Sequence, residues 1–416
     1  MIVIYTKKVT NRIKYVFDFV FQQYFNLDYH ITTNEIEFLA SKDFKINYNN
    51  TIFQNTFNIP QENILIEDNI VPQKVFISKE GEMPILFPTD ENTTIKFDIF
   101  SAIFYLITRY EEYLSNESDE HGRYISSNSI LSKPVFNFRP IVEIWLIYFK
   151  EQILAQDPNL TFKKHTFSKT YTFDIDHAFQ YKGRNWLKHP PNILKKEVRN
   201  VLFQKHKDAF DTFDEITAFI EQTKNPVFFF FLLNDDGEKN SNVCPKNKML
   251  HAIIQRFKNS ITIGIHPSYF FSEENFVAEK KQLEYILDKK IETNRQHFLK
   301  IKIPDYFQVL NKQEIKKDFS LGYPNISACR AGTTQAFYFF DLTKNEQTTL
   351  LIQPFSFMDA TYQYYQKIDD NSITQIVEKQ LEDIQKINGN FVSLFHNDLL
   401  QNQYVYKKLL YLIEEY

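Results

Sequence analysis

The chain has 416 residues, 43% of them hydrophobic, and a formal net charge of −4 at pH 7. It is long enough for two or three globular domains, and its charge gives no general attraction to nucleic acid or to anionic membranes. Its two cysteines, Cys244 and Cys329, exclude a disulfide framework and a cysteine-rich zinc site.

The sequence carries neither a secretory signal pattern nor a run suited to a membrane-spanning helix. A short apolar run, Ile2–Tyr5, is followed by charge rather than preceded by it, which is the reverse of a signal peptide. The longest unbroken apolar run, Val227–Leu233, is far below the roughly 20 residues that a spanning helix needs. We therefore expect a soluble, cytoplasmic protein with no nucleic-acid or membrane partner.

Residues 1–165 are predicted to form a smaller α+β domain. Residues 97–114 and 139–155 have the periodic apolar positions of helices. A polar segment with an Asp-Pro step, Gln156–Lys169, marks the junction to a second domain, 166–416. The predicted strands before these helices are Ile2–Tyr5, Ile64–Ile66, Lys74–Ile77 and Pro84–Phe87.

From residue 170 onward, apolar strands alternate with amphipathic helices. This alternation predicts a parallel α/β sheet or barrel. Active sites in parallel barrels gather at the carboxyl ends of the strands, so polar residues there are the candidates for chemistry. The predicted strands are Lys169–Phe173, Val227–Leu233, Ile261–Ile265, Gln296–Lys300, Ser327–Cys329, Thr349–Gln353 and Asn390–Phe395, and the predicted helices are 209–223, 246–258, 272–293, 304–316 and 373–387.

Asp174 and Asp176 are the leading candidates, because they end the segment Tyr-Thr-Phe-Asp-Ile-Asp-His. Alternation along a strand directs residues i and i+2 to the same side. Two ionised carboxylates that lie so close repel each other unless a cation sits between them or one keeps a proton. The pair therefore indicates a metal or proton-transfer site. The structural alternative is that Asp176 caps a helix and Asp174 is merely exposed.

Histidines and arginines stand at the ends of four other predicted strands. They are His266, Arg295 with His297, Arg330, and His396. A lone histidine at a strand end is more often structural, but recurrence at four ends favours a shared site. Carboxylate and imidazole ligands suit zinc or another divalent first-row metal. One aspartate as ligand, the other as base and a distant histidine as acid would form the skeleton of metal-assisted hydrolysis.

Residues 170–400 resemble the polysaccharide deacetylase (NodB-homology) superfamily of carbohydrate esterases. The whole chain resembles a divergent bacterial branch that has an extra N-terminal domain. The resemblance implies a distorted (β/α) barrel and removal of an acyl group, such as acetyl, from an amino sugar or polysaccharide. It rests on the segments 172–176 (Thr-Phe-Asp-Ile-Asp), 263–269 (Ile-Gly-Ile-His-Pro-Ser-Tyr), 295–299 (Arg-Gln-His-Phe-Leu), 329–333 (Cys-Arg-Ala-Gly-Thr), 358–359 (Met-Asp), 394–397 (Leu-Phe-His-Asn), 109–113 (Arg-Tyr-Glu-Glu-Tyr) and 121–123 (His-Gly-Arg).

The resemblance also implies roles for single residues. Asp174 matches the general base, and Asp176 and His266 match metal ligands. His396 matches the histidine that protonates the leaving amine. The cofactor that this set implies is a divalent metal, in the first place zinc.

One family position is occupied by a different residue. The family's second metal histidine would stand at Phe270, and we expect His297 to supply the missing ligand, with His177 as a weaker candidate. Arg295 or Arg330 would correspond to the arginine that orients the base.

The sequence therefore predicts a metal-dependent hydrolase with a carbohydrate substrate. Tyr269, Phe298 and Phe395 are candidates for stacking against sugar rings. One alternative is a catalytically inactive protein of the same fold that binds or assembles carbohydrate, which the loss of a histidine at Phe270 motivates. A lower alternative is an Asp-based phosphohydrolase, which would also need a lysine and a further acidic pair on later strands.

Overall fold

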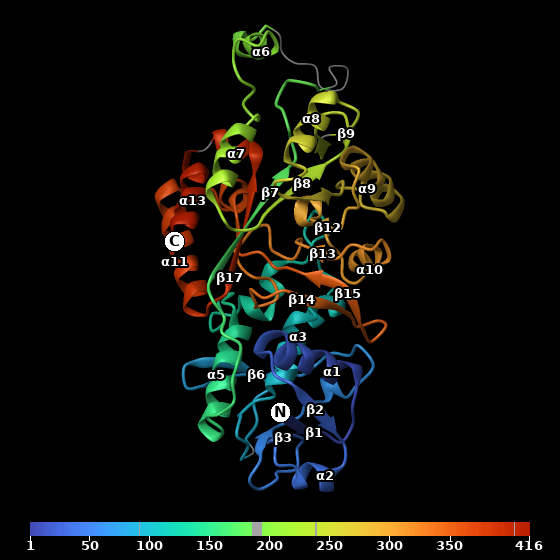
Figure 1. Ribbon diagram of the computed structural model, residues 1–416, viewed down its shortest axis with the longest axis vertical. Coiled ribbons are helices and arrows are strands. Elements are labelled where there is room, and N and C mark those ends of the chain that lie inside the picture. Colours follow the sequence, from blue (N-terminus) through green and yellow to red (C-terminus); the bar gives the residue numbers. More distant parts are fainter. Residues whose placement is uncertain (91, 185–193, 238, 403) are drawn as a thin grey trace.

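A nine-stranded sheet forms the centre of residues 168–396 (Figure 1). The computed structural model describes residues 1–90, 92–184, 194–237, 239–402 and 404–416. The strand order is β14-β15-β13-β12-β11-β8-β7-β17-β16, and all neighbours are parallel except β14 and β15. The strands are β7 (Ser168–Ile175), β8 (Val227–Leu232), β11 (Thr262–His266), β12 (Thr293–Asn294), β13 (Lys317–Asp318), β14 (Phe337–Asp341), β15 (Glu346–Ile352), β16 (Phe357–Met358) and β17 (Asn390–His396).

Helices flank this sheet, with α7, α11 and α13 to the left of the strands in Figure 1 and α8, α9 and α10 to the right. Each buries one apolar stripe, as α8 does with Leu250, Ile254 and Phe257. None of the helices in the described ranges combines the length and apolar character needed to cross a bilayer. The helices are α6 (Lys196–Leu202), α7 (Phe213–Gln222), α8 (Lys248–Phe257), α9 (Glu273–Leu287), α10 (Asp305–Lys312), α11 (Asp370–Lys386), α12 (Asn397–Asn402) and α13 (Tyr404–Glu415).

The fold is therefore mixed α/β with a large, mostly parallel sheet, as the strand–helix alternation predicted. Within the described residues, the edge strands β14 and β16 are not paired with each other. Hydrogen bonding between strands thus leaves the sheet open, and the closed barrel stays a prediction.

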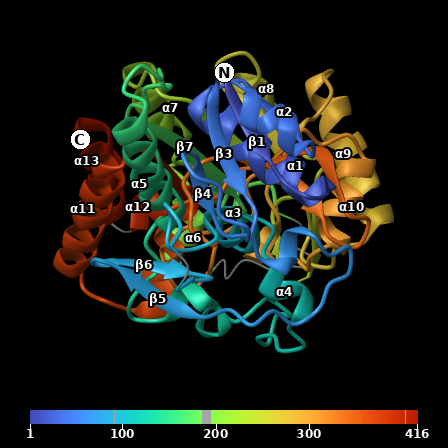
Figure 2. The same cartoon turned by 90° about the horizontal axis from the view of Figure 1, so that it is seen from below.

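The N-terminal residues build a second, smaller parallel sheet with the order β2-β1-β3-β4, which faces the viewer in Figure 2. Sequence reasoning missed β2, β3 and β4, because polar residues interrupt them; β3, for example, carries Asn47, which donates to Asn58 Oδ1 at 2.7 Å. The elements are β1 (Ile2–Tyr5), α1 (Asn11–Phe17), β2 (Tyr29–Thr32), α2 (Glu35–Ala40), β3 (Phe44–Tyr48), β4 (Phe57–Ile59), β5 (Ile77–Glu80), β6 (Met83–Leu86), α3 (Ile99–Ile107), α4 (Tyr110–Leu114) and α5 (Ile141–Gln156).

The helix predicted over 97–114 is broken into α3 and α4. Arg109 lies between them in the left-handed region, with φ 54° and ψ 43°. This bend lets the buried guanidinium of Arg109 reach Glu111 and Glu112, each at 2.7 Å. The break between the two helices therefore accompanies these ion pairs. The apolar periodicity continues through residue 109 and does not indicate the break.

Three predicted strands are absent, the first of them Ile64–Ile66, which overlaps a 3₁₀ turn over Asn63–Leu65. Residues 297–299 form a single 3₁₀ turn after the short β12, and Phe298 and Leu299 have φ of 59° and 53°, which no strand adopts. The segment 327–329 is buried but belongs to no strand in the described sheet. The latter two segments are apolar because they are buried, and burial alone does not specify strand pairing.

The two sheets share one apolar core. Tyr15 of α1 donates its hydroxyl to the backbone oxygen of Tyr338 at 2.7 Å, and the rings of Phe104 and Phe340 lie 5.5 Å apart. A single cluster of buried apolar side chains in contact includes residues from both parts of the chain, from Ile2 to Ile413. The N-terminal elements therefore pack directly on β14 and β15, and the predicted division near residue 165 stays a prediction.

A buried carboxylate at this junction makes stability depend on pH. Glu143 of α5 accepts hydrogen bonds through Oε1 from Thr333 and Thr334, whereas its Oε2 has no partner among the described residues. Burial outweighs these hydrogen bonds and raises the pKa of Glu143 from 4.5 to about 7. The stabilisation from its protonated form is therefore full below pH 4.5 and is lost as the pH rises through 7.

We expect Glu143→Gln to remove this pH dependence, because the amide resembles the protonated acid. Between pH 4.5 and 8, the difference in free energy of unfolding between variant and wild type should change by up to about 3 kcal/mol in favour of the variant. Denaturant unfolding at several pH values measures it. Parallel pH profiles for the two proteins would contradict the assignment.

Candidate metal centre

Three strands of the large sheet, β11, β7 and β17, bring the predicted polar residues together at their carboxyl ends. Asp174 lies near the end of β7 and Asp176 follows that strand, while His266 ends β11 and His396 ends β17. His396 stands in register with Asp174 across the β17–β7 pair. Parallel strands end on the same side, so the sheet itself gathers these side chains.

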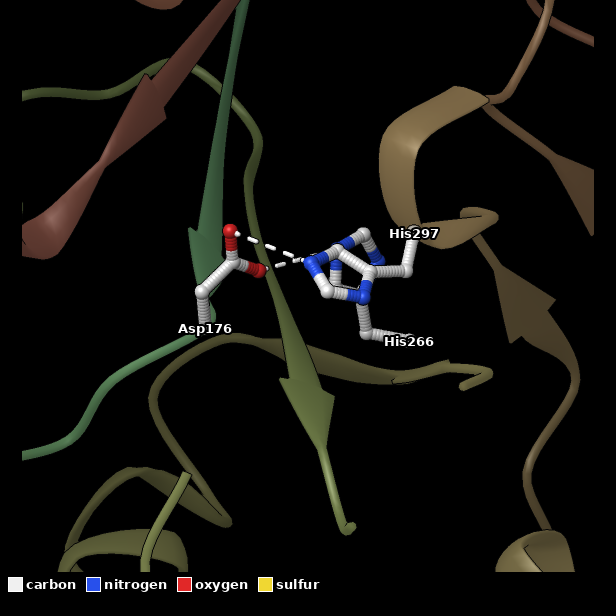
Figure 3. A group of neighbouring side chains, drawn as sticks. All are labelled: Asp176, His266 and His297. Atoms are coloured by element: carbon white, nitrogen blue, oxygen red, sulfur yellow. Dashed lines mark ion pairs between the residues drawn. The ribbon is translucent and has the colours of Figure 1, made fainter. Parts of the chain in front are cut away.

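Asp176, His266 and His297 form a cluster that could hold a metal ion (Figure 3). One potential ligand atom from each residue lies within 4.8 Å of the other two. His266 Nε2 is 3.1 Å from Asp176 Oδ1, and His297 Nε2 is 3.5 Å from Asp176 Oδ2. We call these three residues the triad. A carboxylate with two imidazoles is a ligand set that catalytic zinc sites use, with a further position left open.

His297 reaches the triad through the 3₁₀ turn rather than from a strand. The left-handed backbone of Phe298 and Leu299 turns the chain immediately after it. Strained residues of this kind collect at functional sites. The sequence therefore identified His297 correctly as a neighbour of His266. It predicted a strand at this position, however, where the structure has a 3₁₀ turn.

Hydrogen bonds at the far nitrogen atoms orient both imidazoles. His266 Nδ1 lies 2.6 Å from the backbone oxygen of Arg295, which leaves Nε2 directed at Asp176. His297 Nδ1 lies 3.4 Å from Asn240 Oδ1. Such outer partners fix the tautomer and ring orientation of metal-binding histidines. Asn240 was not foreseen, and nothing in its sequence context marks it.

The charge of each triad side chain shifts the pKa of its neighbours. Burial disfavours the carboxylate of Asp176, but His297 and His266 outweigh it and hold its pKa well below its usual value of 3.8. Burial lowers the pKa of His297 despite the nearby Asp176. Burial opposes a charge on His266, but Asp174 and Asp176 outweigh it and raise the pKa of that imidazole, so metal binding at the triad would release a proton from it.

Asp174 lies on the same side as Asp176, as strand alternation predicted. Its Oδ2 is 3.7 Å from His266 Nε2, and its Oδ1 is 3.8 Å from Arg295 Nη1. The guanidinium of Arg295 is fully buried among the rings of Phe230, Phe319 and Phe355, at 5.1, 5.9 and 5.2 Å from their centroids. Held in this aromatic cage, Arg295 presents its charge to Asp174.

His396 has a carboxylate partner that sequence reasoning did not assign. Its Nδ1 is 2.6 Å from Asp359 Oδ1, and its Nε2 is 3.9 Å from Asp176 Oδ2. Burial opposes the charged imidazole, but Asp359 outweighs it and raises the pKa of His396 to about 10. His396 is therefore protonated at neutral pH and points its other nitrogen at the triad. The Met-Asp pair at 358–359, directly after an apolar run, was the available signal.

The other predicted arginine lies outside this cluster. Arg330 donates to both carboxylate oxygens of Glu112 in α4, with Nε to Oε1 at 2.8 Å, and its Nη1 donates to the backbone oxygen of Gly322. Glu112 also pairs with Arg109. Of the two arginines, the structure brings Arg295 to Asp174, and it uses Arg330 to attach α4 to the 322–330 loop. The prediction for Arg330 as the orienting arginine is corrected accordingly.

Glu112→Ala is expected to destabilise the protein by about 3–5 kcal/mol, because it leaves two buried guanidinium groups without their shared carboxylate. Chemical denaturation measures this loss. Asp383→Ala, which breaks an exposed ion pair with Lys379 on α11, is the matched control and should cost less than about 1 kcal/mol. Equal effects of the two substitutions would contradict a role for the Glu112 network in stability.

Neither His177, the weaker candidate for the missing ligand, nor Phe270, the position where the family has its histidine, is part of the triad. His177 stacks on Phe210 at 5.9 Å and contacts Arg184 Nη2 through Nδ1 at 3.3 Å. Phe270 is 60% exposed, which shows that its side chain points to solvent. His297 is therefore the residue that occupies the third place in the candidate site.

A cleft of about 220 Å³ opens above the triad. One wall carries Phe298, and another carries Tyr364 and Tyr365 from a π-helical turn, Thr361–Gln366. Arg123, from the N-terminal part of the chain, donates through Nη1 to the backbone oxygen of Phe298 and to Tyr365 Oη, both at 3.0 Å. Arg123, the last residue of the His-Gly-Arg segment, thus forms hydrogen bonds to both walls of the cleft.

Comparisons with known proteins give the following likenesses. A family model described as a family of unknown function (DUF7033) matches residues 2–158. No curated protein matches the chain. A polysaccharide deacetylase structure from Mycobacterium smegmatis is 13% identical, with 61% of this chain and 84% of that chain covered and a TM-score of 0.41.

Two other solved structures are similar over the same share of the chain. A polysaccharide deacetylase from Bacillus cereus is 12% identical, with 60% of this chain and 88% of that chain covered and a TM-score of 0.32. A mutant of a CE4 family pseudoenzyme with restored enzymatic activity is 8% identical, with coverages of 59% and 62% and a TM-score of 0.31. The chain is thus similar to polysaccharide deacetylases, the family that its motifs resemble. At these identities and TM-scores, the likeness assigns no residue and no activity.

Proposed function

We propose that the chain is a metal-dependent hydrolase that removes an acyl group, in the first place acetyl, from an amino sugar or polysaccharide. The observation that carries the proposal is the convergence of the triad with two flanking groups. Asp174 lies 3.7 Å from His266, and His396 lies 3.9 Å from Asp176. We also propose that the large sheet corresponds to the distorted (β/α) barrel of the deacetylase family.

The donor atoms of the triad fit a divalent metal, in the first place zinc. Such an ion would polarise the acyl carbonyl and acidify a water molecule. Asp176, His266 and His297 would hold it, and the hydrogen bonds of His266 and His297 to Arg295 and Asn240 would keep the two imidazoles in place.

The remaining steps belong to side chains of the protein. Asp174, held by Arg295, would accept a proton from the attacking water. His396, protonated beside Asp359, would donate a proton to the nitrogen or oxygen of the departing sugar. A base and an acid that both lie beside the triad are what hydrolysis of an amide or ester requires, because one proton leaves the water and one joins the leaving group.

The test combines metal content with product release. Protein loaded with zinc is expected to bind it stoichiometrically and to release acetate from an N-acetylated chito-oligosaccharide or an O-acetylated polysaccharide. Asp176→Ala is expected to lose both properties, whereas Asp305→Asn, which alters a carboxylate at the start of α10, should lose neither. If the wild type showed no metal binding and no acetate release, the proposal would be refuted.

The inactive alternative makes a different prediction in the same experiment. It is favoured by Phe270, whose exposed ring cannot serve as the family's second histidine ligand. An inactive protein that only binds carbohydrate would bind the oligosaccharide with the same affinity in wild type and Asp176→Ala and release acetate in neither.

A further inference from the structure

Lysines alternate with aromatic rings along a surface that begins at the cleft, where Lys239 and Phe298 belong to the lining, and continues beyond it. Lys239, between β9 (Asp235–Gly237) and β10 (Asn240–Ser241), lines the cleft with its Nζ 5.3 Å from the Phe298 ring centroid. Lys300 Nζ lies 4.0 Å from the centroid of Tyr269, whose ring is 5.1 Å from that of Phe298. We call Lys239, Phe298, Tyr269, Lys300 and Phe270 the lysine–aromatic wall.

The ammonium groups of this wall have unused hydrogen-bonding capacity. Within the described part of the chain, no carboxylate oxygen lies within 4.0 Å of Lys239 Nζ or Lys300 Nζ. Their contacts are with ring faces, which attract a cation but do not satisfy its three N–H donors. A ligand with negative oxygen atoms could therefore bind here without displacing an ion pair of the protein.

The lysines are not counterions of Asp174, Asp176 or Asp359, because each of these carboxylates has a partner of its own. Asp174 faces Arg295 at 3.8 Å, and Asp359 faces His396 at 2.6 Å. Asp176 faces the two histidines of the triad. The two positive charges of the wall thus remain available to a ligand.

The wall also offers exposed apolar surface beside the cleft. Phe270 is 60% exposed, and Lys300 Nζ lies 5.7 Å from its ring centroid. Tyr364, which is 56% exposed, lines the cleft as well. Rings beside cations suit a chain of sugar rings that carries charged groups, because sugar faces stack on the rings while the charges meet the lysines.

We propose that the cleft and the adjoining lysine–aromatic wall bind an acidic glycan, in which acylated amino sugars alternate with carboxylate-bearing sugars, and that Lys239 and Lys300 contact the carboxylates. This proposal rests on the proposed function for the identity of the acylated sugar. It assigns the lysine–aromatic wall to substrate selection rather than to the chemical step. Phe270, at the family's histidine position, belongs to this wall instead of the metal site.

Binding to metal-free protein tests the proposal independently of hydrolysis. Two probes share N-acetylglucosamine units: a hyaluronan tetrasaccharide, which alternates them with glucuronate, and the neutral N-acetylchitotetraose. Isothermal titration at low salt should give about tenfold tighter binding of hyaluronan, the range expected for charge-assisted contacts. The preference should shrink as salt is raised, because salt screens charge pairs.

Lys239→Gln with Lys300→Gln should abolish the preference and leave the affinity for the neutral oligomer unchanged. Lys290→Gln, which alters an exposed lysine paired with Glu314, should keep the preference, and so should Lys239→Arg with Lys300→Arg, which retains both charges. Equal affinity of the wild type for both probes, no binding of hyaluronan, or a preference that persists in the glutamine variant would overturn the proposal. A preference in a wild type that neither binds zinc nor releases acetate from either probe would uphold this inference and refute the hydrolase.

Discussion

Asp174→Asn is expected to lower kcat for acetate release by about 10²–10⁴-fold, the usual contribution of a general base, while the protein keeps its full metal content. The amide has nearly the shape of the carboxylate but cannot accept a proton from water at neutral pH. The side chain is 3.7 Å from His266 but is not one of the three triad residues. Activity and metal affinity should therefore separate in this variant.

Measurement of acetate release and of zinc content on the same preparation checks this separation. Asp305→Asn is the control for loss of a carboxylate outside the cleft lining, and it should change neither quantity. If Asp174→Asn lost zinc together with activity, Asp174 would be a ligand rather than the base. If the variant kept more than a tenth of the wild-type kcat, a group other than Asp174 would be accepting the proton of the attacking water.

His297→Ala is expected to weaken zinc binding by at least about 100-fold, since loss of a mere outer partner of a ligand already costs 10–100-fold. The substitution removes one of three donors and leaves Asp176 and His266 in place. Acetate release at limiting zinc should fall in parallel. Competition with a chromophoric zinc chelator measures the affinity directly.

His121→Ala provides the matched control for loss of an imidazole close to the cleft. His121 Nδ1 lies 3.0 Å from Tyr269 Oη, and the residue is not part of the triad. Its replacement should leave zinc affinity unchanged. Wild-type affinity in His297→Ala would show that the third ligand is another residue, and the candidate metal centre would then have to be redrawn.

The candidate site was predictable where it depends on strand ends. Asp174, Asp176, His266 and His396 each lie at or near the end of a strand whose apolar run is visible in the sequence. Parallel strands necessarily end on one side, so the types of residue at those ends already indicated metal-assisted chemistry. Closure of the barrel and the division into domains stay predictions.

Residues whose roles depend on turns and buried charge were not predictable in this way. Arg295 and Arg330 look alike in the sequence, yet one sits in a cage of rings beside Asp174 and the other pairs with Glu112. The difference arises from which loop packs against which, and no local pattern encodes that. Asp359 likewise becomes the partner of His396 only because β16 pairs with β17.

The sequence by itself determined the strand–helix alternation, the chemical types of the candidate ligands and the departure at Phe270. The tertiary structure decided that His297, rather than His177, lies together with Asp176 and His266, and a left-handed turn at Phe298 and Leu299 follows it directly. It also decided that Arg123 of the N-terminal part joins the two walls of the cleft. Periodicity reports which face of an element is buried, whereas convergence of distant side chains depends on register, turns and packing between elements.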